Sequence, residues 1–164
     1  MSDPDQHRTS SRDGAPAQAR VVGLGQPLRG DDALGWRVVD GLKQRGLGRF
    51  AFFSAGDPAE FLALLEPVES VLIIDAAAAS APVGTVYRFD VGNSPLPGLG
   101  WQASTHSFDL ATLIELARAL GRLPRRAWVY AIVAASFALG ATLTPAVAGS
   151  VRAVEAELAA WLGG

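Results

Sequence analysis

The stretch VVGLGQPLRGDDALGWRVVD (residues 21–40) shows how the chain is organised. An apolar run ends at glycines, and two adjacent aspartates, Asp31 and Asp32, stand before an amphipathic pattern that includes Leu34 and Leu42. A short apolar run bounded by glycine is typical of a buried strand, and apolar residues every three or four positions are typical of a helix. The stretch therefore predicts a strand, a turn that carries two carboxylates, and a helix.

The same alternation of apolar strands and amphipathic helices continues along the chain. Strands are predicted at 20–26, 49–55, 70–79, 82–91 and 126–134, and helices at 31–46, 57–66, 105–121 and 144–162. This order predicts an α/β fold, a three-layer α/β/α sandwich around a twisted, five-stranded, mostly parallel sheet. The short connection between the third and fourth strands predicts that one strand is antiparallel.

Two of the predicted helices have recognisable starts. Asp57 followed by Pro58 is typical of an N-cap followed by proline in the first turn. Ser104 or Thr105 can cap the helix predicted at 105–121, which would place His106 in its first turn. A helix N-terminus disfavours imidazolium, so this position predicts a neutral ring that can bind a metal.

The length and composition exclude several classes of protein. The polar composition of residues 1–19 predicts a disordered tail. The total length of 164 residues predicts a single domain, at 20–164. A net charge of -2 gives no basic surface for nucleic acid, and no apolar run reaches the roughly 18 residues of a membrane helix. The absence of cysteine excludes thiol catalysis and fits a cytoplasmic location. We therefore expect neither nucleic acid nor membrane as a partner.

Three aspartates and one histidine follow predicted strands. Asp31 and Asp32 follow the first strand, Asp75 ends the third, and His106 comes after the fourth. Because the carboxyl ends of parallel strands lie along one edge of a sheet, these side chains are expected at the same edge. The alternatives are structural: one aspartate of the pair can cap the helix, Asp75 can bind the following turn, and His106 can be a surface residue.

Two carboxylates and one imidazole form a donor set that suits Zn²⁺, Ni²⁺, Fe²⁺ or Mn²⁺. Three protein ligands leave one coordination position open, as in catalytic metal sites. A dinucleotide site is disfavoured, because Leu28 stands where G-x-G-x-x-G needs its third glycine and Pro27 removes an N–H. The sequence therefore predicts a metal site at Asp32, Asp75 and His106.

Three motifs occur in a fixed order along the chain. GLGQPLRGDDALG (23–35) fits G-x-G-N-x-L-x-x-D-[DE]-x-x-G apart from Gln26, VLIIDAAAASAPVGT (71–85) is a strand that ends in aspartate before a P-x-G-T turn, and STHSFDLATLIELARALGRLP (104–124) opens with [ST]-x-H. Over about residues 20–162 the chain resembles the hydrogenase maturation endopeptidases, which process the large subunit of [NiFe] hydrogenases. It lacks the D-G-G-T-x-G turn common in that family, of which Gly56 remains.

The resemblance implies an endopeptidase that removes the C-terminal extension of a [NiFe]-hydrogenase large-subunit precursor after nickel insertion. It implies that Asp32, Asp75 and His106 coordinate the metal, which arrives as nickel in the precursor and whose place other divalent ions can take. Asp31, or Asp32 when it binds no metal, is the candidate general base. We expect a monomer whose partner is the precursor.

Two other functions stay open at this point. A non-catalytic assembly factor that binds the large subunit is favoured by the missing turn near Gly56. A small nucleotide-binding enzyme of the α/β class would show a nucleotide-dependent shift in melting temperature.

Overall fold

The computed structural model describes residues 18–97 and 109–163. The strands are β1 (Ala19–Leu24), β2 (Ala51–Ser54), β3 (Ser70–Ala77), β4 (Val86–Asp90) and β5 (Arg126–Val133). The helices are α1 (Leu34–Gln44), α2 (Pro58–Leu64), α3 (Leu110–Ala119) and α4 (Pro145–Gly163), with short 3₁₀ helices η1 (Gly30–Ala33) and η2 (Gly48–Phe50). Every predicted strand and helix is present, and the differences lie at their ends.

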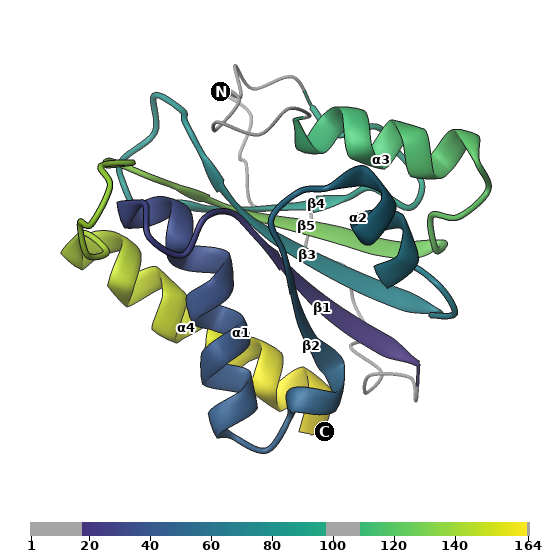
Figure 1. Cartoon of the computed structure of the whole chain (residues 1–164), viewed down its shortest axis with the longest axis horizontal. Coiled ribbons are helices and arrows are strands. Elements are labelled where there is room, and N and C mark those ends of the chain that lie inside the picture. The colour runs from purple at the N-terminus through teal and green to yellow at the C-terminus, as the bar shows by residue number, and fades with distance from the viewer. Residues whose placement is uncertain (1–17, 98–108, 164) are drawn as a thin grey trace, which may run out of the picture.

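The strands form one sheet in the order β2-β1-β3-β5-β4. All neighbouring pairs are parallel except β4 and β5, which are antiparallel. Helices α1 and α4 cover one face of the sheet, and α2 and α3 cover the other (Figure 1). The predicted three-layer fold with one antiparallel strand is confirmed. The antiparallel partner of β4 is β5, which lies between β3 and β4 although β3 and β4 are consecutive in the sequence.

Strand β3, in the middle of the sheet, shows how the two apolar cores form. All eight of its residues are buried. Side chains alternate along a strand, so Leu72 and Ile74 pack in the core beneath α1 and α4, and Ile73 packs in the core beneath α2 and α3. Burying one such side chain contributes about 1.5–3 kcal/mol. Asp75 is two residues after Ile73, so its carboxylate lies on the same face of the sheet, next to apolar side chains.

The start of α2 and the end of α1 agree with the sequence signals. Asp57 is the N-cap of α2, and its side chain accepts a hydrogen bond from the Glu60 backbone N–H at 2.9 Å, as predicted. The helix expected from residue 31 begins as η1 and becomes α-helical at Leu34. Gly46, with a φ of 79°, ends that helix as predicted, because a left-handed residue stops helical hydrogen bonding.

Helix α3 begins later than the sequence pattern predicts. Its first residue is Leu110, and its N-cap is Asp109, whose carboxylate accepts a hydrogen bond from the Thr112 N–H at 2.7 Å. The prediction that Ser104 or Thr105 caps this helix is therefore wrong. A carboxylate is as good a cap as a hydroxyl, and the apolar pattern alone could not decide between successive candidates.

Gly23 and Gly35 allow α1 to lie directly against the sheet. A Cβ atom on Gly23 would overlap the Gly35 carbonyl oxygen, and one on Gly35 would be 2.5 Å from the Leu24 carbonyl oxygen and 3.0 Å from that of Ile74. A larger residue at either position would push the helix away from β1 and β3. These two glycines therefore bring the start of α1, and Asp32 with it, close to the strand ends.

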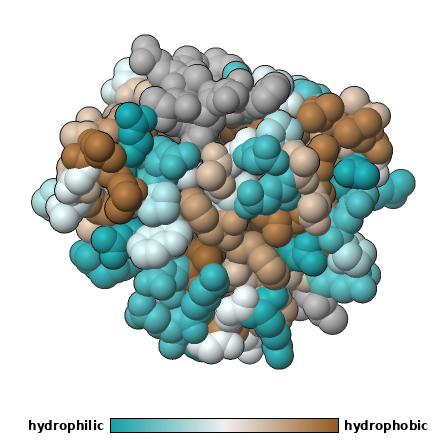
Figure 2. Space-filling view, viewed as in Figure 1, coloured by the Kyte–Doolittle hydropathy of each residue, from teal (hydrophilic) through white to brown (hydrophobic). Residues whose placement is uncertain are grey.

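The surface mixes polar and apolar residues (Figure 2). Apolar side chains gather at the left of that view, where Figure 1 shows the connection between β5 and α4. Leu28 and Leu139 are the most exposed large apolar residues of the described chain, at 72% and 77%. None of the described helices is long and apolar enough to cross a membrane.

Candidate active site

Two of the candidate carboxylates are buried at the carboxyl ends of neighbouring strands. Asp32 lies in η1, after β1, and is 1% exposed. Asp75 lies two residues before the end of β3 and is 7% exposed. Strands β1 and β3 are parallel neighbours, and the charge of Asp32 acts on Asp75. The structure thus brings these two candidates together at one edge of the sheet.

The surroundings of Asp75 favour its protonated form. Burial, and to a smaller extent the nearby Asp32 carboxylate, raise the pKa of Asp75 to about 7, although a hydrogen bond from the Ala76 N–H to Asp75 Oδ1 at 2.8 Å opposes the rise. A carboxyl group with this pKa holds a proton near neutral pH and loses it readily to a base or a cation. Perturbed groups of this kind are concentrated at functional sites.

The turn before Asp32 is closed by backbone hydrogen bonds. The Gln26 N–H donates to the Asp32 carbonyl oxygen at 3.2 Å, and the Asp32 N–H donates to the Arg29 carbonyl oxygen at 3.0 Å. Gly25 has a φ of 128°, and a Cβ atom there would overlap the Asp32 carbonyl oxygen. Gly25 therefore lets the chain turn sharply off β1 and come back close to Asp32.

We expect Gly25→Ala to lower the melting temperature by about 10 °C, because alanine combines a disfavoured φ with a backbone overlap. Gly46→Ala is the matched control, since Gly46 also has a positive φ but has no atom within 4 Å of the added Cβ. The control should lose only about 3–6 °C, the effect of the φ strain alone. Thermal unfolding followed by circular dichroism measures both, and equal losses would contradict a role for the close approach to Asp32.

Asp31 lies beside Asp32 but is bound to a different part of the chain. Its Oδ2 accepts hydrogen bonds from the N–H groups of Ala135 at 2.8 Å and Ser136 at 3.1 Å. Its Oδ1 accepts from the Thr144 N–H at 2.7 Å, and the Thr144 hydroxyl donates to the same carboxylate. The residue is fully buried. Asp31 therefore holds the connection between β5 and α4 (residues 134–144) against the turn that precedes α1.

These contacts correct the expectation that one aspartate of the pair caps the following helix. Neither η1 nor α1 has a side-chain N-cap hydrogen bond. The Asp31 carboxylate binds the residues just before α4 instead, more than 100 positions away in the sequence. Sequence reasoning missed this link, because spacing along the chain gives no sign of which distant backbone N–H groups a carboxylate will meet.

His106, the third candidate ligand, lies outside the described residues. Helix α3 runs antiparallel to β5, so its first turn is at the same edge of the sheet as Asp32 and Asp75 (Figure 1). Within residues 18–97 and 109–163, no group of three acidic, histidine or cysteine side chains could hold a metal ion. A site with three protein ligands at this edge therefore needs one from outside these ranges, and His106 stays the predicted one.

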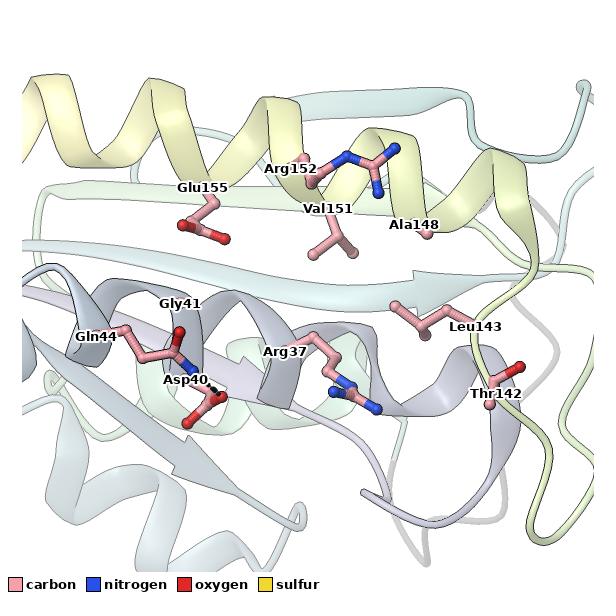
Figure 3. A pocket seen from close by; sticks show the side chains of 10 residues that line it. All are labelled: Arg37, Asp40, Gly41, Gln44, Thr142, Leu143, Ala148, Val151, Arg152 and Glu155. Atoms are coloured by element: carbon pink, nitrogen blue, oxygen red, sulfur yellow. Dashed lines mark hydrogen bonds between the residues drawn. The ribbon is translucent and has the colours of Figure 1, made fainter.

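A separate groove of about 370 Å³ lies between α1 and α4 (Figure 3). Neither Asp32 nor Asp75 lines it. Its two acidic residues already have partners: Glu155 pairs with Arg45 at 2.6 Å, and Asp40 accepts a hydrogen bond from Gln44 at 2.8 Å. The groove offers no arrangement of groups for catalysis, so the candidate site remains the edge with the buried carboxylates.

Comparison with family models decides the class of the protein. The model described as "Hydrogenase maturation protease" matches residues 37–161, a range that includes Asp75 and His106 and begins after Asp32. The chain belongs to the hydrogenase maturation protease family. As a member of that family it is a peptidase, and the family resemblance inferred from the three motifs is confirmed.

Solved structures show the same fold for this maturation protease. The chain is similar to the [NiFe] hydrogenase maturation protease HycI of Thermococcus kodakarensis KOD1, with a TM-score of 0.67 and 21% sequence identity. The match covers 93% of this chain and 98% of that chain. The chain is also similar to the hydrogenase maturating endopeptidase HybD of E. coli (TM-score 0.67, 21% identity, 86% and 89% covered) and to the endopeptidase HycI of Escherichia coli (TM-score 0.70, 18% identity, 90% and 94% covered). A search of curated proteins gave no match.

Proposed function

We propose that this maturation protease removes the C-terminal extension of a [NiFe]-hydrogenase large-subunit precursor after nickel insertion, and that Asp32, Asp75 and His106 bind the nickel that the precursor carries. The observation that supports the proposal most is the pair of buried carboxylates, Asp32 and Asp75, in a member of this family. The nickel is part of the substrate in this proposal, and other divalent ions can take its place.

The donor chemistry of the two carboxylates fits a divalent cation. Two negative charges buried side by side repel each other, which is one reason why the pKa of Asp75 is raised. A cation between them would relieve both the repulsion and the burial cost, and it would displace the proton from Asp75. Carboxylates with one imidazole suit nickel as well as zinc, iron or manganese. Bound there, such an ion supplies polarisation of a carbonyl or activation of a water molecule.

The chain's own residues divide the remaining tasks. Asp32, fixed by the turn after Gly25, and Asp75, fixed by the central strand, position the ion and the substrate attached to it. Asp75 holds a proton near neutral pH before the ion binds and gives it up when the ion binds, so it is a ligand and not a proton donor in the loaded site. Asp31, the earlier candidate for general base, uses both carboxylate oxygens to hold the 134–144 connection. We therefore assign a positioning role to Asp31 and keep Asp32, in a state where it does not bind the ion, as the candidate general base.

The direct test is the mass of the nickel-loaded precursor with and without this protein. Wild-type protein should reduce that mass by the mass of the C-terminal peptide, and His106→Ala should lower the rate at least about a hundredfold, because it removes a ligand. His7→Ala is the matched control, since His7 is the other histidine of the chain and lies in the polar tail. It should process the precursor at the wild-type rate.

Other outcomes separate the alternatives. Normal cleavage by His106→Ala would remove that residue from the site. A stable complex with the precursor and no change in its mass would favour the non-catalytic assembly factor. Processing of a metal-free precursor at the same rate as the nickel-loaded one would contradict the nickel dependence.

A further inference from the structure

The two most exposed large apolar side chains of the described residues lie on neighbouring loops. Leu28 is 72% exposed in the turn between β1 and η1, and Leu139 is 77% exposed in the connection between β5 and α4. Leu116 on α3 and Leu120, the residue that follows α3, are less exposed at 37% and 54%. Single exposed leucines are common on protein surfaces, but two highly exposed ones on adjoining loops form a patch. We call Leu28 and Leu139 the leucine patch.

The loops that carry the leucine patch are bonded to each other. The Gly140 N–H donates to the Leu28 carbonyl oxygen at 2.8 Å, and the Asp31 N–H donates to the Ser136 carbonyl oxygen at 2.7 Å. The Asp31 carboxylate adds the hydrogen bonds from Ala135, Ser136 and Thr144. Five backbone and side-chain links of this kind hold the patch in place, so its exposure is not the result of loops that detach from the fold.

The leucine patch lies close to the candidate active site. Leu28 and Asp32 are four residues apart in one turn, so their Cα atoms are at most about 15 Å apart. An extended peptide covers this distance with about five residues. A polypeptide whose reacting bond lies at Asp32 and Asp75 therefore reaches Leu28 within a few residues of that bond.

The charges around the leucine patch favour an apolar partner. Residues 25–29 and 134–144 contain no acidic side chain and one basic side chain, Arg29. The two carboxylates nearest in sequence, Asp31 and Asp32, are only 0% and 1% exposed and add no charge to the surface of the patch. A basic segment would thus find no counter-charge here, whereas an apolar segment would cover two leucines.

We infer that the leucine patch binds an apolar segment of the large-subunit precursor, next to the bond that is cleaved. The inference rests on the proposed function, because it takes the precursor as the occupant. Covering Leu28 and Leu139 removes apolar surface from water, which strengthens binding of the precursor without taking part in the reaction. The patch therefore raises the affinity for the precursor and contributes to the choice of substrate, whereas the buried carboxylates take part in cleavage of the peptide bond.

The test compares Leu28→Ser/Leu139→Ser with Leu116→Ser/Leu120→Ser. The control pair is also apolar and exposed, but it lies toward the end of α3 that leads into β5, at the opposite edge of the sheet (Figure 1). The probe is the nickel-loaded large-subunit precursor from the source organism, measured for binding (Kd) and for cleavage (kcat and KM). The patch variant should raise Kd and KM about tenfold or more, with kcat within about twofold and an unchanged melting temperature. The control pair should match the wild type in Kd, KM, kcat and melting temperature.

Several results would overturn the inference. Wild-type Kd and KM in the patch variant would do so, as would equal losses in both variants, since these would indicate a general effect of lost surface leucines. A wild-type dimer that the patch variant loses, with precursor binding unchanged, would make a second copy of this chain the occupant. If the wild type binds the precursor without cleaving it, the proposed function fails while the Kd comparison still decides the role of the patch. If the wild type does not bind the precursor at all, the patch has another role.

Discussion

Metal-free Asp75→Asn protein is expected to melt about 10 °C above the wild type at pH 8. In the wild type, burial and the neighbouring Asp32 raise the pKa of Asp75 from 3.8 to about 7. Ionising this carboxyl at pH 8 therefore costs the folded state about 4 kcal/mol relative to the unfolded chain. Asparagine carries no charge and keeps an oxygen for the Ala76 N–H, so it removes this cost while preserving the hydrogen bond.

The stabilisation by Asp75→Asn is expected to depend on pH. The unfolded chain releases the Asp75 proton near pH 4, and the folded protein keeps it until about pH 7. The contribution of Asp75 to stability is therefore greatest below pH 4 and falls as the pH rises to about 7. The difference in melting temperature between Asp75→Asn and wild type should be small near pH 4, grow through pH 5 and 6, and level off above pH 7.

The measurement is thermal unfolding in the presence of a chelator across that pH range. Glu69→Gln, an exposed acid just before β3, is the control and should follow the wild-type curve. The stabilised Asp75→Asn protein should also fail to process the nickel-loaded precursor, because it lacks a proposed ligand. A variant that is both more stable and inactive would separate the chemical role of Asp75 from a structural one. A gap in melting temperature that does not change with pH would contradict the role of its charge.

Asp31→Ala is expected to have the opposite effect and to lower the melting temperature by about 10 °C or more. Removing the carboxylate leaves the N–H groups of Ala135, Ser136 and Thr144 without their acceptor in a region where Asp31 is fully buried. Buried donors that lose their acceptor cost about 1–3 kcal/mol each, and the total for this cluster is about 3–5 kcal/mol because such effects do not add fully. The loss should be present at any metal concentration.

Thr144→Val provides the matched comparison for Asp31. It removes the hydroxyl that donates to Asp31 but keeps the backbone donor and the β-branched shape, so it should cost only about 1 kcal/mol. Asp31→Asn keeps the size of the side chain and places an NH₂ group against N–H donors, so it should be nearly as unstable as Asp31→Ala. If Asp31 acted only as a general base, both Asp31 variants would lose turnover and keep the wild-type melting temperature. That result would contradict the positioning role of Asp31.

The motif GLGQPLRGDDALG illustrates how far sequence reasoning reached. Its glycines and apolar spacing predicted a strand, a sharp turn and a helix, and Gly25 and α1 agree. The motif predicted a metal ligand at Asp32 and a helix cap or general base at Asp31, and it missed the contacts of Asp31, because spacing along the chain does not show which distant groups a carboxylate meets. Only the fold shows that Asp31 meets the 134–144 connection and that Asp32 meets Asp75.

The sequence by itself determined the order of strands and helices, the three layers and the edge of the sheet where the polar residues gather. These follow from hydrophobic periodicity and from glycine and proline positions, which act over a few residues. The tertiary structure decided which strand pairs with β4, what Asp31 binds, how strongly Asp75 holds its proton and which leucines stay exposed. Each of these depends on groups far apart in the chain, so burial and distance had to be known before charge and hydrogen bonding could be assigned.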